Sequence, residues 1–272
     1  MPELPEVETI KRGIAPHIEN QTVCEVLIRE KRLRWPVPEN LGKLLQKQCL
    51  KQINRRGKYL LFQFIQGHLI IHLGMSGSLR LLPVDSPPQK HDHVDIFFDN
   101  NVCLRYRDPR RFGCVLWTNL PVDEHPLLRD LGPEPLERTF HGQYLYQLTR
   151  TKRIAIKNCI MNSHHVVGVG NIYANEALFL AKISPFSPSN QLTLLQCKQL
   201  VKHIKHVLNL AIKKGGTTLR DFVNGQGQPG YFQQVLRVYG RHNQPCVNCG
   251  NQIVKTQLGQ RATYYCPHCQ TN

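Results

Sequence analysis

Four cysteines near the carboxyl end of the sequence have the spacing of a metal site. Cys246 and Cys249 form one Cys-x2-Cys pair, Cys266 and Cys269 form a second, and sixteen residues separate the two pairs. Two such pairs can bring four thiolates to one tetrahedral point, which suits zinc. The other six cysteines are scattered singly, as small buried side chains in a reducing compartment would be. The spacing therefore predicts one structural Zn2+.

The amino end carries a second chemically unusual group. Met1 precedes a small residue, so an aminopeptidase should remove it and leave Pro2 with a free secondary amine. The pKa of such an amine lies near ~8 rather than near the ~10.4 of lysine. Glu3 and Glu6 follow, so an amine nucleophile would stand beside a possible general acid or base. Proline and glutamate also suit the first turn of any helix, and the residue types alone leave both interpretations open.

The charge of the chain indicates a polyanionic partner. It has 35 Lys and Arg against 19 Asp and Glu, a formal net charge of +16. Residues 31–60 hold nine basic residues and one acid, and the chain after Glu176 holds eleven basic residues and one acid. Two separate basic regions favour nucleic acid. No run of 18 apolar residues and no basic leader occurs, so we expect a protein without a membrane span or secretory signal.

The elements that must position these groups fall into an amino-terminal and a carboxyl-terminal half. A helix is expected over 2–15, ended by Gly13 and Pro16, and a short helix near 40–47. Alternating apolar residues predict a two-layered β-sandwich or barrel. Its eight strands are expected at 22–29, 49–55, 58–65, 68–73, 78–83, 93–99, 101–107 and 113–118.

The second half has a different composition. Four prolines mark residues 121–138 as a linker, and an apolar period of 3.6 predicts helices from about 139 to 214. Glycines predict a loop at 215–230, and strands are expected near 252–256 and 261–265 of the zinc module. The expected domains are 1–120, 139–235 and 236–272, which gives an α+β multidomain fold class.

Several motifs resemble one known family along the whole chain, in order. They are MPELPEVETI at the amino end, GMSG at 74–77, DPRRFG at 108–113, GVGNIYANEAL at 168–178 and the four-cysteine module. This combination resembles bacterial formamidopyrimidine-DNA glycosylases, which excise oxidised purines such as 8-oxoguanine and then cut the strand. The resemblance implies a β-sandwich joined to a helix–two-turn–helix domain with a zinc hairpin.

The resemblance assigns catalytic roles. The amine of Pro2 would attack C1′ of the damaged nucleotide, expel the base and form an iminium, and Glu3 would protonate the sugar ring oxygen. Lys58 matches the proton donor of β-elimination, although its position in RRGK equally suits a phosphate clamp. Arg261 matches the residue assigned to δ-elimination. Glu6 is expected only to support the helix start.

The resemblance also assigns DNA contacts. Met75, Arg110 and Phe112 would fill the space left by a flipped nucleotide. The expected phosphate and other DNA contacts are His72, His91, Arg110, Lys152, Asn171 and Tyr239, with Arg261 beside Asn171. His93 rivals His91, and Asn171 could also be an ordinary helix N-cap. Residues 215–232 resemble the segment that closes over the oxidised base.

One departure from the family pattern is notable: Lys157 is kept, but Asn158 and Cys159 replace a Pro-Trp pair, so local packing could differ. Two alternatives stay open. One is an endonuclease VIII-like enzyme acting on oxidised pyrimidines, and the other is a non-catalytic zinc-hairpin DNA-binding protein. We expect damaged double-stranded DNA as the partner, no membrane partner, a monomer, and a cytoplasmic location with the bacterial chromosome.

Overall fold

The computed structural model describes residues 2–216 and 235–271, and it divides into two compact units. One unit comprises Met1–Arg129 with Lys214–Tyr231, and the other comprises Asp130–Lys213 with Phe232–Asn272. The expected loop at 215–230 lies largely outside the described residues. Among the described residues, no helix combines the length and apolar character that crossing a bilayer requires.

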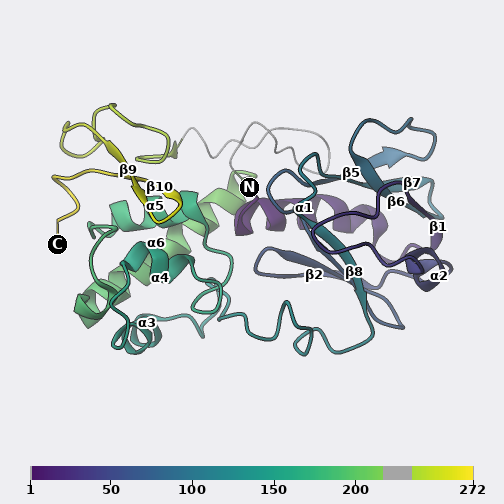
Figure 1. Cartoon of the computed structure of the whole chain (residues 1–272), viewed down its shortest axis with the longest axis horizontal. Helices are drawn as coiled ribbons and strands as arrows, with labels where there is room; N and C mark the ends of the chain where they lie inside the picture. The colour runs from purple at the N-terminus through teal and green to yellow at the C-terminus, as the bar shows by residue number, and fades with distance from the viewer. Residues whose placement is uncertain (1, 217–234, 272) are drawn as a thin grey trace. The chain divides into compact units, whose positions relative to one another are not determined.

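Helix α1 (Leu4–Ile18) opens the first unit (Figure 1). Glu3 is its N-cap, and buried side chains recur along one face at Val7, Ile10, Ile14 and Ile18. The expected end near Gly13 and Pro16 was wrong, because Pro16 lies inside the last turn. A proline there removes a single helical hydrogen bond. Ile18, four residues after Ile14, is fully buried in the sandwich core, and its burial offsets that loss.

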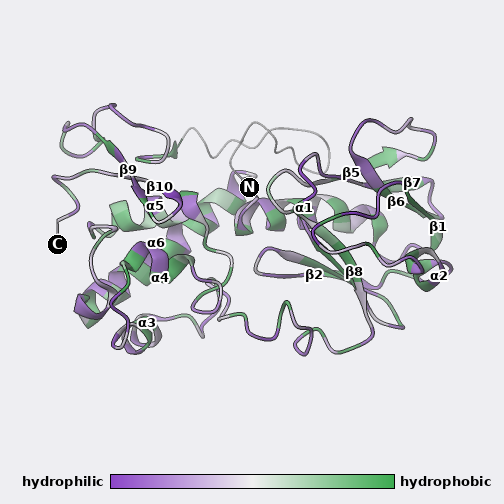
Figure 2. Cartoon of the chain, viewed as in Figure 1, coloured by the Kyte–Doolittle hydropathy of each residue, from purple (hydrophilic) through white to green (hydrophobic). Residues whose placement is uncertain are grey.

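The predicted two-layered β-sandwich is confirmed as two antiparallel four-stranded sheets, ordered β1-β6-β7-β5 and β2-β3-β4-β8. The strands are β1 (Val23–Ile28), β2 (Gln52–Arg56), β3 (Tyr59–Gln63), β4 (His68–His72), β5 (Ser78–Pro83), β6 (Asp92–Phe98), β7 (Val102–Arg107) and β8 (Cys114–Thr118). Short helix α2 (Leu41–Leu45) follows β1. One apolar core contains side chains from both sheets and from α1, including Phe62, Ile71, Ile96 and Leu104. Figure 2 shows β8 in the colour of hydrophobic residues, and Val115 of this strand belongs to the same core.

The second unit is helical with a small hairpin. Its described helices are α3 (Gly142–Thr149), α4 (Ile156–Met161), α5 (Asn171–Leu180), the short 3-10 helix η1 (Ser189–Gln191) and α6 (Leu194–Lys213). Helix α6 begins at a capping box in which Thr193 and Gln196 exchange hydrogen bonds between side chain and backbone. The predicted apolar face of α6 is confirmed, since Leu200, Ile204 and Leu208 are fully buried.

The hairpin pairs β9 (Val254–Leu258) with β10 (Arg261–Tyr265), and β10 packs on α5 (Figure 1). The strand expected at 252–256 begins two residues later than predicted. Gln252 and Ile253 instead bond back to the preceding loop, where Ile253 donates its N–H to Gln244 at 2.9 Å. The fully buried Ile253 side chain anchors this loop in the core of the zinc module.

Candidate functional site

Pro2 and Glu3 are both buried at the amino end of α1. The backbone N–H of Glu3 donates to Glu6 Oε2 at 2.9 Å, and Glu6 is itself fully buried. Glu6 therefore supports the start of the helix in a capping box, as its sequence position predicts. The positive end of the helix dipole at Pro2 disfavours a protonated amine and attracts anions. This position suits an amine that must react in its neutral form next to a phosphate.

Lys58 lies in the two-residue turn Gly57–Lys58 between β2 and β3, where it is half-buried. The Arg55 side chain ties this turn to α1, because it donates to Glu8 Oε2 at 2.9 Å and to the Gly57 carbonyl at 3.0 Å. Burial opposes the ionisation of Glu8, but hydrogen bonds from Arg12 and Arg55 outweigh it and lower the Glu8 pKa. The helix that carries Pro2 and the turn that carries Lys58 are thus joined by a charged network.

His72 ends β4 beside these groups. Burial, with smaller effects of the Lys58 and Arg34 charges, lowers its pKa to about 4, so the imidazole is neutral at pH 7. Its Nδ1 accepts a hydrogen bond from the Gly74 N–H at 3.0 Å. An accepting Nδ1 leaves the proton on Nε2. His72 can therefore donate one hydrogen bond to a phosphate oxygen without carrying a positive charge.

The three residues expected to fill a DNA void lie on two loops of the same unit. Met75 is half-buried in the turn between β4 and β5, and Phe112 is 44% exposed in the loop after β7. The Arg110 guanidinium lies over the Phe112 ring, with Cζ 4.8 Å from the ring centroid. This exposure argues against a role of Phe112 in the hydrophobic core. A phenylalanine ring that is exposed beside a cation suits stacking on a DNA base.

The two histidines of KHDH have different environments. His93 is buried on β6, where its Nε2 lies 2.8 Å from the Asp108 carbonyl oxygen. His91 precedes the strand with a positive φ of 76°, and its side chain is only half-buried. Burial of its ring, with added effects of nearby cations such as Lys90 and Arg107, lowers the His91 pKa. Of the two, His91 is the more exposed, and its contact with DNA stays a prediction.

In the second unit, α5 and β10 bring together the residues expected to hold a phosphate. Asn171 is the first residue of α5 after an N-cap at Gly170, so it is not itself the N-cap. Its Nδ2 donates to the Ala262 carbonyl at 3.0 Å, which places it one residue from the exposed Arg261. Asn175 receives a hydrogen bond from the Tyr264 N–H at 2.9 Å. Two asparagines of α5 thus dock β10.

Lys157, which matches the family pattern, has a structural role that the sequence analysis did not assign. It lies on α4, its side chain is fully buried, and its Nζ donates to Ala262 O at 3.0 Å and to Thr263 Oγ1 at 2.7 Å. The family's Pro-Trp pair is replaced directly after this lysine, yet α4 still forms and presents Lys157 to β10. The expectation of altered packing therefore does not extend to the lysine itself.

Tyr239 is positioned by a buried carboxylate. Glu176, 2% exposed on α5, accepts hydrogen bonds from the consecutive backbone N–H groups of Arg237, Val238 and Tyr239, each at 2.9 Å. Burial raises the Glu176 pKa even though these bonds oppose the rise. The Tyr239 ring packs on Tyr264 of β10 at a centroid distance of 5.0 Å. Sequence reasoning missed Glu176, because its partners lie more than sixty residues away along the chain.

Lys152 is the least defined of the expected contacts. It lies between α3 and α4, with its backbone N–H bonded to Thr149 O at 2.9 Å and its carbonyl bonded to Asn190 N. Its side chain is half-buried. The backbone is therefore anchored at this position, and a role of its ammonium group in DNA binding stays a prediction.

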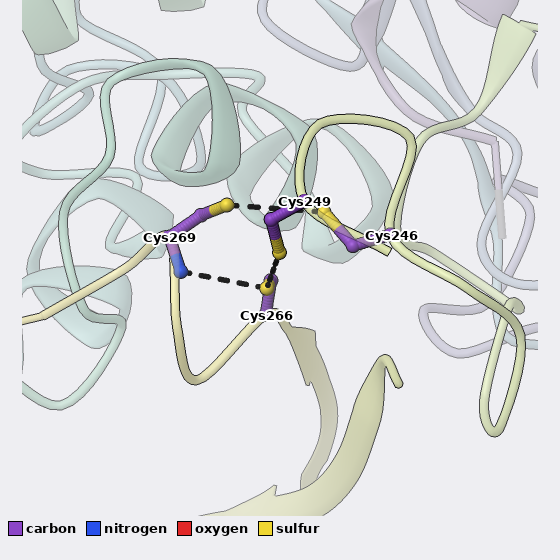
Figure 3. Close-up of side chains that lie close together, drawn as sticks. All are labelled: Cys246, Cys249, Cys266 and Cys269. Atoms are coloured by element: carbon purple, nitrogen blue, oxygen red, sulfur yellow. Dashed lines mark hydrogen bonds between the residues drawn. The ribbon is translucent and has the colours of Figure 1, made fainter. Parts of the chain in front are cut away.

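The four predicted zinc ligands converge. The sulfurs of Cys246, Cys249, Cys266 and Cys269 all lie within 4.8 Å of one another (Figure 3). Two of the sulfur–sulfur distances are 3.9 Å and 3.5 Å. A tetrahedron with Zn–S bonds of about 2.3 Å has edges of about 3.8 Å, so the cluster fits one zinc ion.

Hydrogen bonds to the sulfurs orient the ligands. Asn251 Nδ2 donates to Cys249 Sγ at 3.5 Å, and the Asn248 N–H donates to Cys246 Sγ at 3.4 Å. The bonds from Asn251 are the main cause that lowers the Cys249 pKa to about 6, whereas burial raises the pKa of Cys266 and of Cys269. Zinc binding must therefore displace protons from the latter two thiols, so zinc affinity should depend on pH. The donor set and its hydrogen bonds therefore suit a structural zinc ion.

Family comparisons cover almost the whole chain. The formamidopyrimidine-DNA glycosylase N-terminal domain matches residues 1–115, its H2TH domain matches 131–223, and the zinc finger found in FPG and IleRS matches 243–272. The chain is 58% identical over 270 residues to the formamidopyrimidine-DNA glycosylase of Methylococcus capsulatus, with 99% of this chain and 100% of that protein covered. The corresponding protein of Saccharophagus degradans is 55% identical over the same length.

Solved structures agree with the sequence matches. A wild-type Lactococcus lactis Fpg (MutM) bound to DNA containing N7-benzyl-Fapy-dG superposes with a TM-score of 0.92 at 35% identity, covering 100% of both chains. The MutM (Fpg) protein of Thermus thermophilus superposes with a TM-score of 0.89, also at 35% identity, covering 99% of this chain and 98% of that one. The chain therefore belongs to the formamidopyrimidine-DNA glycosylase family, and it is a DNA-binding repair glycosylase and AP lyase with one structural zinc ion.

Proposed function

We propose that this enzyme excises oxidised purines, 8-oxoguanine and formamidopyrimidines, with Pro2 as the nucleophile. Once Met1 is removed, the secondary amine of Pro2 attacks C1′ and the damaged base leaves with the electrons of the glycosidic bond. The amine nitrogen releases its proton, which the expelled base takes up. The sugar ring opens as its oxygen takes a proton from Glu3, and the nitrogen and C1′ form an iminium. This cation acidifies the C2′ proton. β-elimination can then break the C3′–O bond to the 3′ phosphate, and δ-elimination the C5′–O bond to the 5′ phosphate.

The observation that carries this proposal is the burial of Pro2 and Glu3 together at the start of α1. A helix amino terminus holds the amine where its neutral form is favoured. Burial limits the access of water to Glu3, which strengthens its interactions with a developing charge. The matched N-terminal family domain spans this helix, which argues against the non-catalytic alternative.

The elimination steps require proton transfer and a fixed phosphate. Lys58 is proposed as the proton donor of β-elimination, and the tie between its turn and α1 keeps it near the helix that carries Pro2. Arg261 is proposed to assist δ-elimination, and with Asn171 to hold the phosphate beside the flipped nucleotide. Neutral His72 and the ring-stacked Tyr239 are proposed as further phosphate contacts, because each can donate one hydrogen bond.

The remaining DNA contacts are proposed from exposure and charge. Met75 and Phe112 fill the stack after the nucleotide leaves it, and Arg110 bonds the orphaned cytosine. His91 and Lys152 are proposed as contacts to the DNA backbone. We also propose that the enzyme acts as a monomer in the cytoplasm, with the chromosomal DNA.

Borohydride trapping tests the mechanism. The full chain is mixed with a duplex that holds one 8-oxoguanine opposite cytosine, reduced with borohydride, digested and mapped by mass spectrometry. We expect DNA on the amino-terminal proline, and residual trapping by Pro2→Gly, whose primary amine lacks the geometry of the ring. DNA attached at Lys58 would refute Pro2 as nucleophile while leaving the glycosylase assignment intact.

A lesion panel tests the substrate class. A Lactococcus lactis Fpg structure contains DNA with an oxidised pyrimidine, so the panel includes one beside 8-oxoguanine and formamidopyrimidine substrates. We expect faster excision of the two purine lesions under single-turnover conditions. Faster excision of the pyrimidine would favour an activity like that of endonuclease VIII.

A further inference from the structure

Asp108 is a fully buried carboxylate at the start of the loop that carries Arg110 and Phe112. Its Oδ1 accepts from Ser76 Oγ at 2.7 Å and from the Arg110 backbone N–H at 3.3 Å. Its Oδ2 accepts from the Gly113 N–H at 2.9 Å and from Tyr106 OH at 3.2 Å. Four donors thus converge on one side chain.

Three of these donors come from two different loops, and the fourth, Tyr106, lies on strand β7. Ser76 follows Met75 in the turn between β4 and β5, and Ser76 Oγ also accepts from the Arg110 N–H at 3.1 Å. The turn and the loop are in backbone contact, since a Cβ added to Gly74 would meet the backbone of Phe112 and lie 2.5 Å from Gly113 N. The three side chains proposed to fill the DNA void are therefore held by one buried anion.

We infer that Asp108 is a positioning residue for void filling and for recognition of the opposite base. The inference rests on the proposed function and deepens it. Arg110 can discriminate cytosine from adenine only if its backbone is fixed relative to the Met75 and Phe112 wedges. Asp108 supplies that fixed spacing, because its two oxygens bond the backbone on both sides of Phe112 and the turn next to Met75.

Asparagine at this position keeps the shape but cannot keep the bonds. Each carboxylate oxygen faces one hydroxyl, which can reverse its role, and one backbone N–H, which can only donate. The amide NH2 of Asp108→Asn must therefore face the N–H of either Arg110 or Gly113, whichever way it turns. In one orientation the Gly113 N–H meets a donor where it had an acceptor, and in the other the Arg110 N–H loses its bond to residue 108 and keeps only the one to Ser76 Oγ.

The test compares Asp108→Asn with wild type on three DNA substrates. They are duplexes with 8-oxoguanine opposite cytosine, the same lesion opposite adenine, and a single strand with one abasic site. We expect Asp108→Asn to lower excision opposite cytosine roughly tenfold, the worth of one hydrogen bond to a charged group. The ratio of the excision rate opposite cytosine to the rate opposite adenine should fall toward one. Borohydride trapping on the single strand with an abasic site should stay unchanged, because this substrate has no opposite base to contact.

Asp99→Asn is the matched control, because it makes the same chemical change on an exposed aspartate of the same unit, in the turn between β6 and β7. It should behave as wild type on all three substrates. A second measurement places 2-aminopurine opposite an abasic site, where insertion of the wedge changes its fluorescence. The amplitude of this change should fall in Asp108→Asn and not in Asp99→Asn.

Ser76→Ala tests the same link if Asp108→Asn does not fold. It removes the bond between the turn that carries Met75 and Asp108. The ratio of the excision rate opposite cytosine to the rate opposite adenine should again fall, by a smaller factor than in Asp108→Asn. An unchanged ratio in a folded Asp108→Asn or Ser76→Ala protein, or an equal loss on all three substrates, overturns the inference. A wild-type chain that leaves 8-oxoguanine in place contradicts the proposed function instead, and the 2-aminopurine signal still tests the role of Asp108.

Discussion

Replacing Arg261 by alanine separates phosphate positioning from general attraction to DNA. Arg261 begins β10 and is exposed, and the adjacent Ala262 carbonyl is held by both Asn171 and Lys157. Lys255, exposed on the neighbouring strand β9, provides the matched control. Each substitution removes one positive charge from the same hairpin, so only the position of the charge differs between the two variants.

The expected magnitudes differ by the kind of interaction that is lost. A hydrogen bond to a charged group contributes about 1.5–3 kcal/mol, so its loss at a phosphate held during cleavage slows the reaction roughly 10- to 150-fold. Loss of one phosphate contact changes the slope of log affinity against log salt by only about 0.9. Arg261→Ala should therefore impair cleavage strongly and binding to undamaged duplex a few-fold, whereas Lys255→Ala should affect binding alone.

Asn171→Ala provides an independent check on the same phosphate. Its folding cost should be small, at most about 1 kcal/mol, because Lys157 still donates to the Ala262 carbonyl. Cleavage should nevertheless fall, and the double variant with Arg261→Ala should lose less than the two single effects combined, with a coupling of about 0.5–3 kcal/mol. Single-turnover cleavage of an 8-oxoguanine duplex and anisotropy on undamaged duplex measure these quantities. Equal cleavage by the Arg261→Ala and Lys255→Ala enzymes, or strict additivity, would refute the reasoning.

Three further predictions concern the metal, the acid range and the buried carboxylate of α5. Chelation should release one zinc per chain, unfold the hairpin and weaken DNA binding while the β-sandwich keeps its thermal transition; zinc release without loss of binding would contradict this. Because the folded pKa of His72 is lowered to about 4, its contribution to stability is complete above about 6.5 and is lost as pH falls toward 4. This contribution of His72 to the free energy of unfolding is at most about 3.5 kcal/mol, since a tenfold change in proton affinity is worth about 1.4 kcal/mol. Urea unfolding of wild type and His72→Gln across this range should show a shallower acid decline in the variant, and parallel curves would argue against it. Glu176→Ala leaves three backbone N–H groups unbonded, so it should destabilise the second unit by several kcal/mol, measurable by calorimetry; a change below about 1 kcal/mol would show that water replaces the carboxylate.

Local patterns in the sequence predict much of the fold. Alternation within strands such as Asp92–Phe98 and the 3.6-residue period of α6 arise from burial on one face, which a single segment displays on its own. The zinc site was predictable because the two cysteines of each Cys-x2-Cys pair are only three residues apart, which a short stretch of sequence displays on its own. The end of α1 was not, because Pro16 marks a stop that the burial of Ile18 in a distant core overrides.

The supports of the site were not predictable, because they join residues far apart in the sequence. Lys157 bonds a strand that lies 105 residues further along the chain, and Ser76 bonds a carboxylate 32 residues away. A lysine on a helix or a serine in a turn has an ordinary local context, so no spacing rule distinguishes it. Only folding shows that these side chains are buried and fully bonded.

The supports share one physical design. Each of three groups proposed to contact DNA lies next to a buried polar side chain that bonds its backbone or that of the adjacent residue. Asp108 bonds the Arg110 N–H, Glu176 bonds the N–H of the half-buried Tyr239, and Lys157 bonds the Ala262 carbonyl beside Arg261. An unpaired buried polar group costs more than a paired one contributes, so each support strongly favours a single backbone geometry. The exposed side chains contribute charge and stacking area, which many sequences could supply. Substitution of a support should therefore reduce discrimination between DNA substrates before it reduces overall affinity, which depends on charge summed over the basic surface.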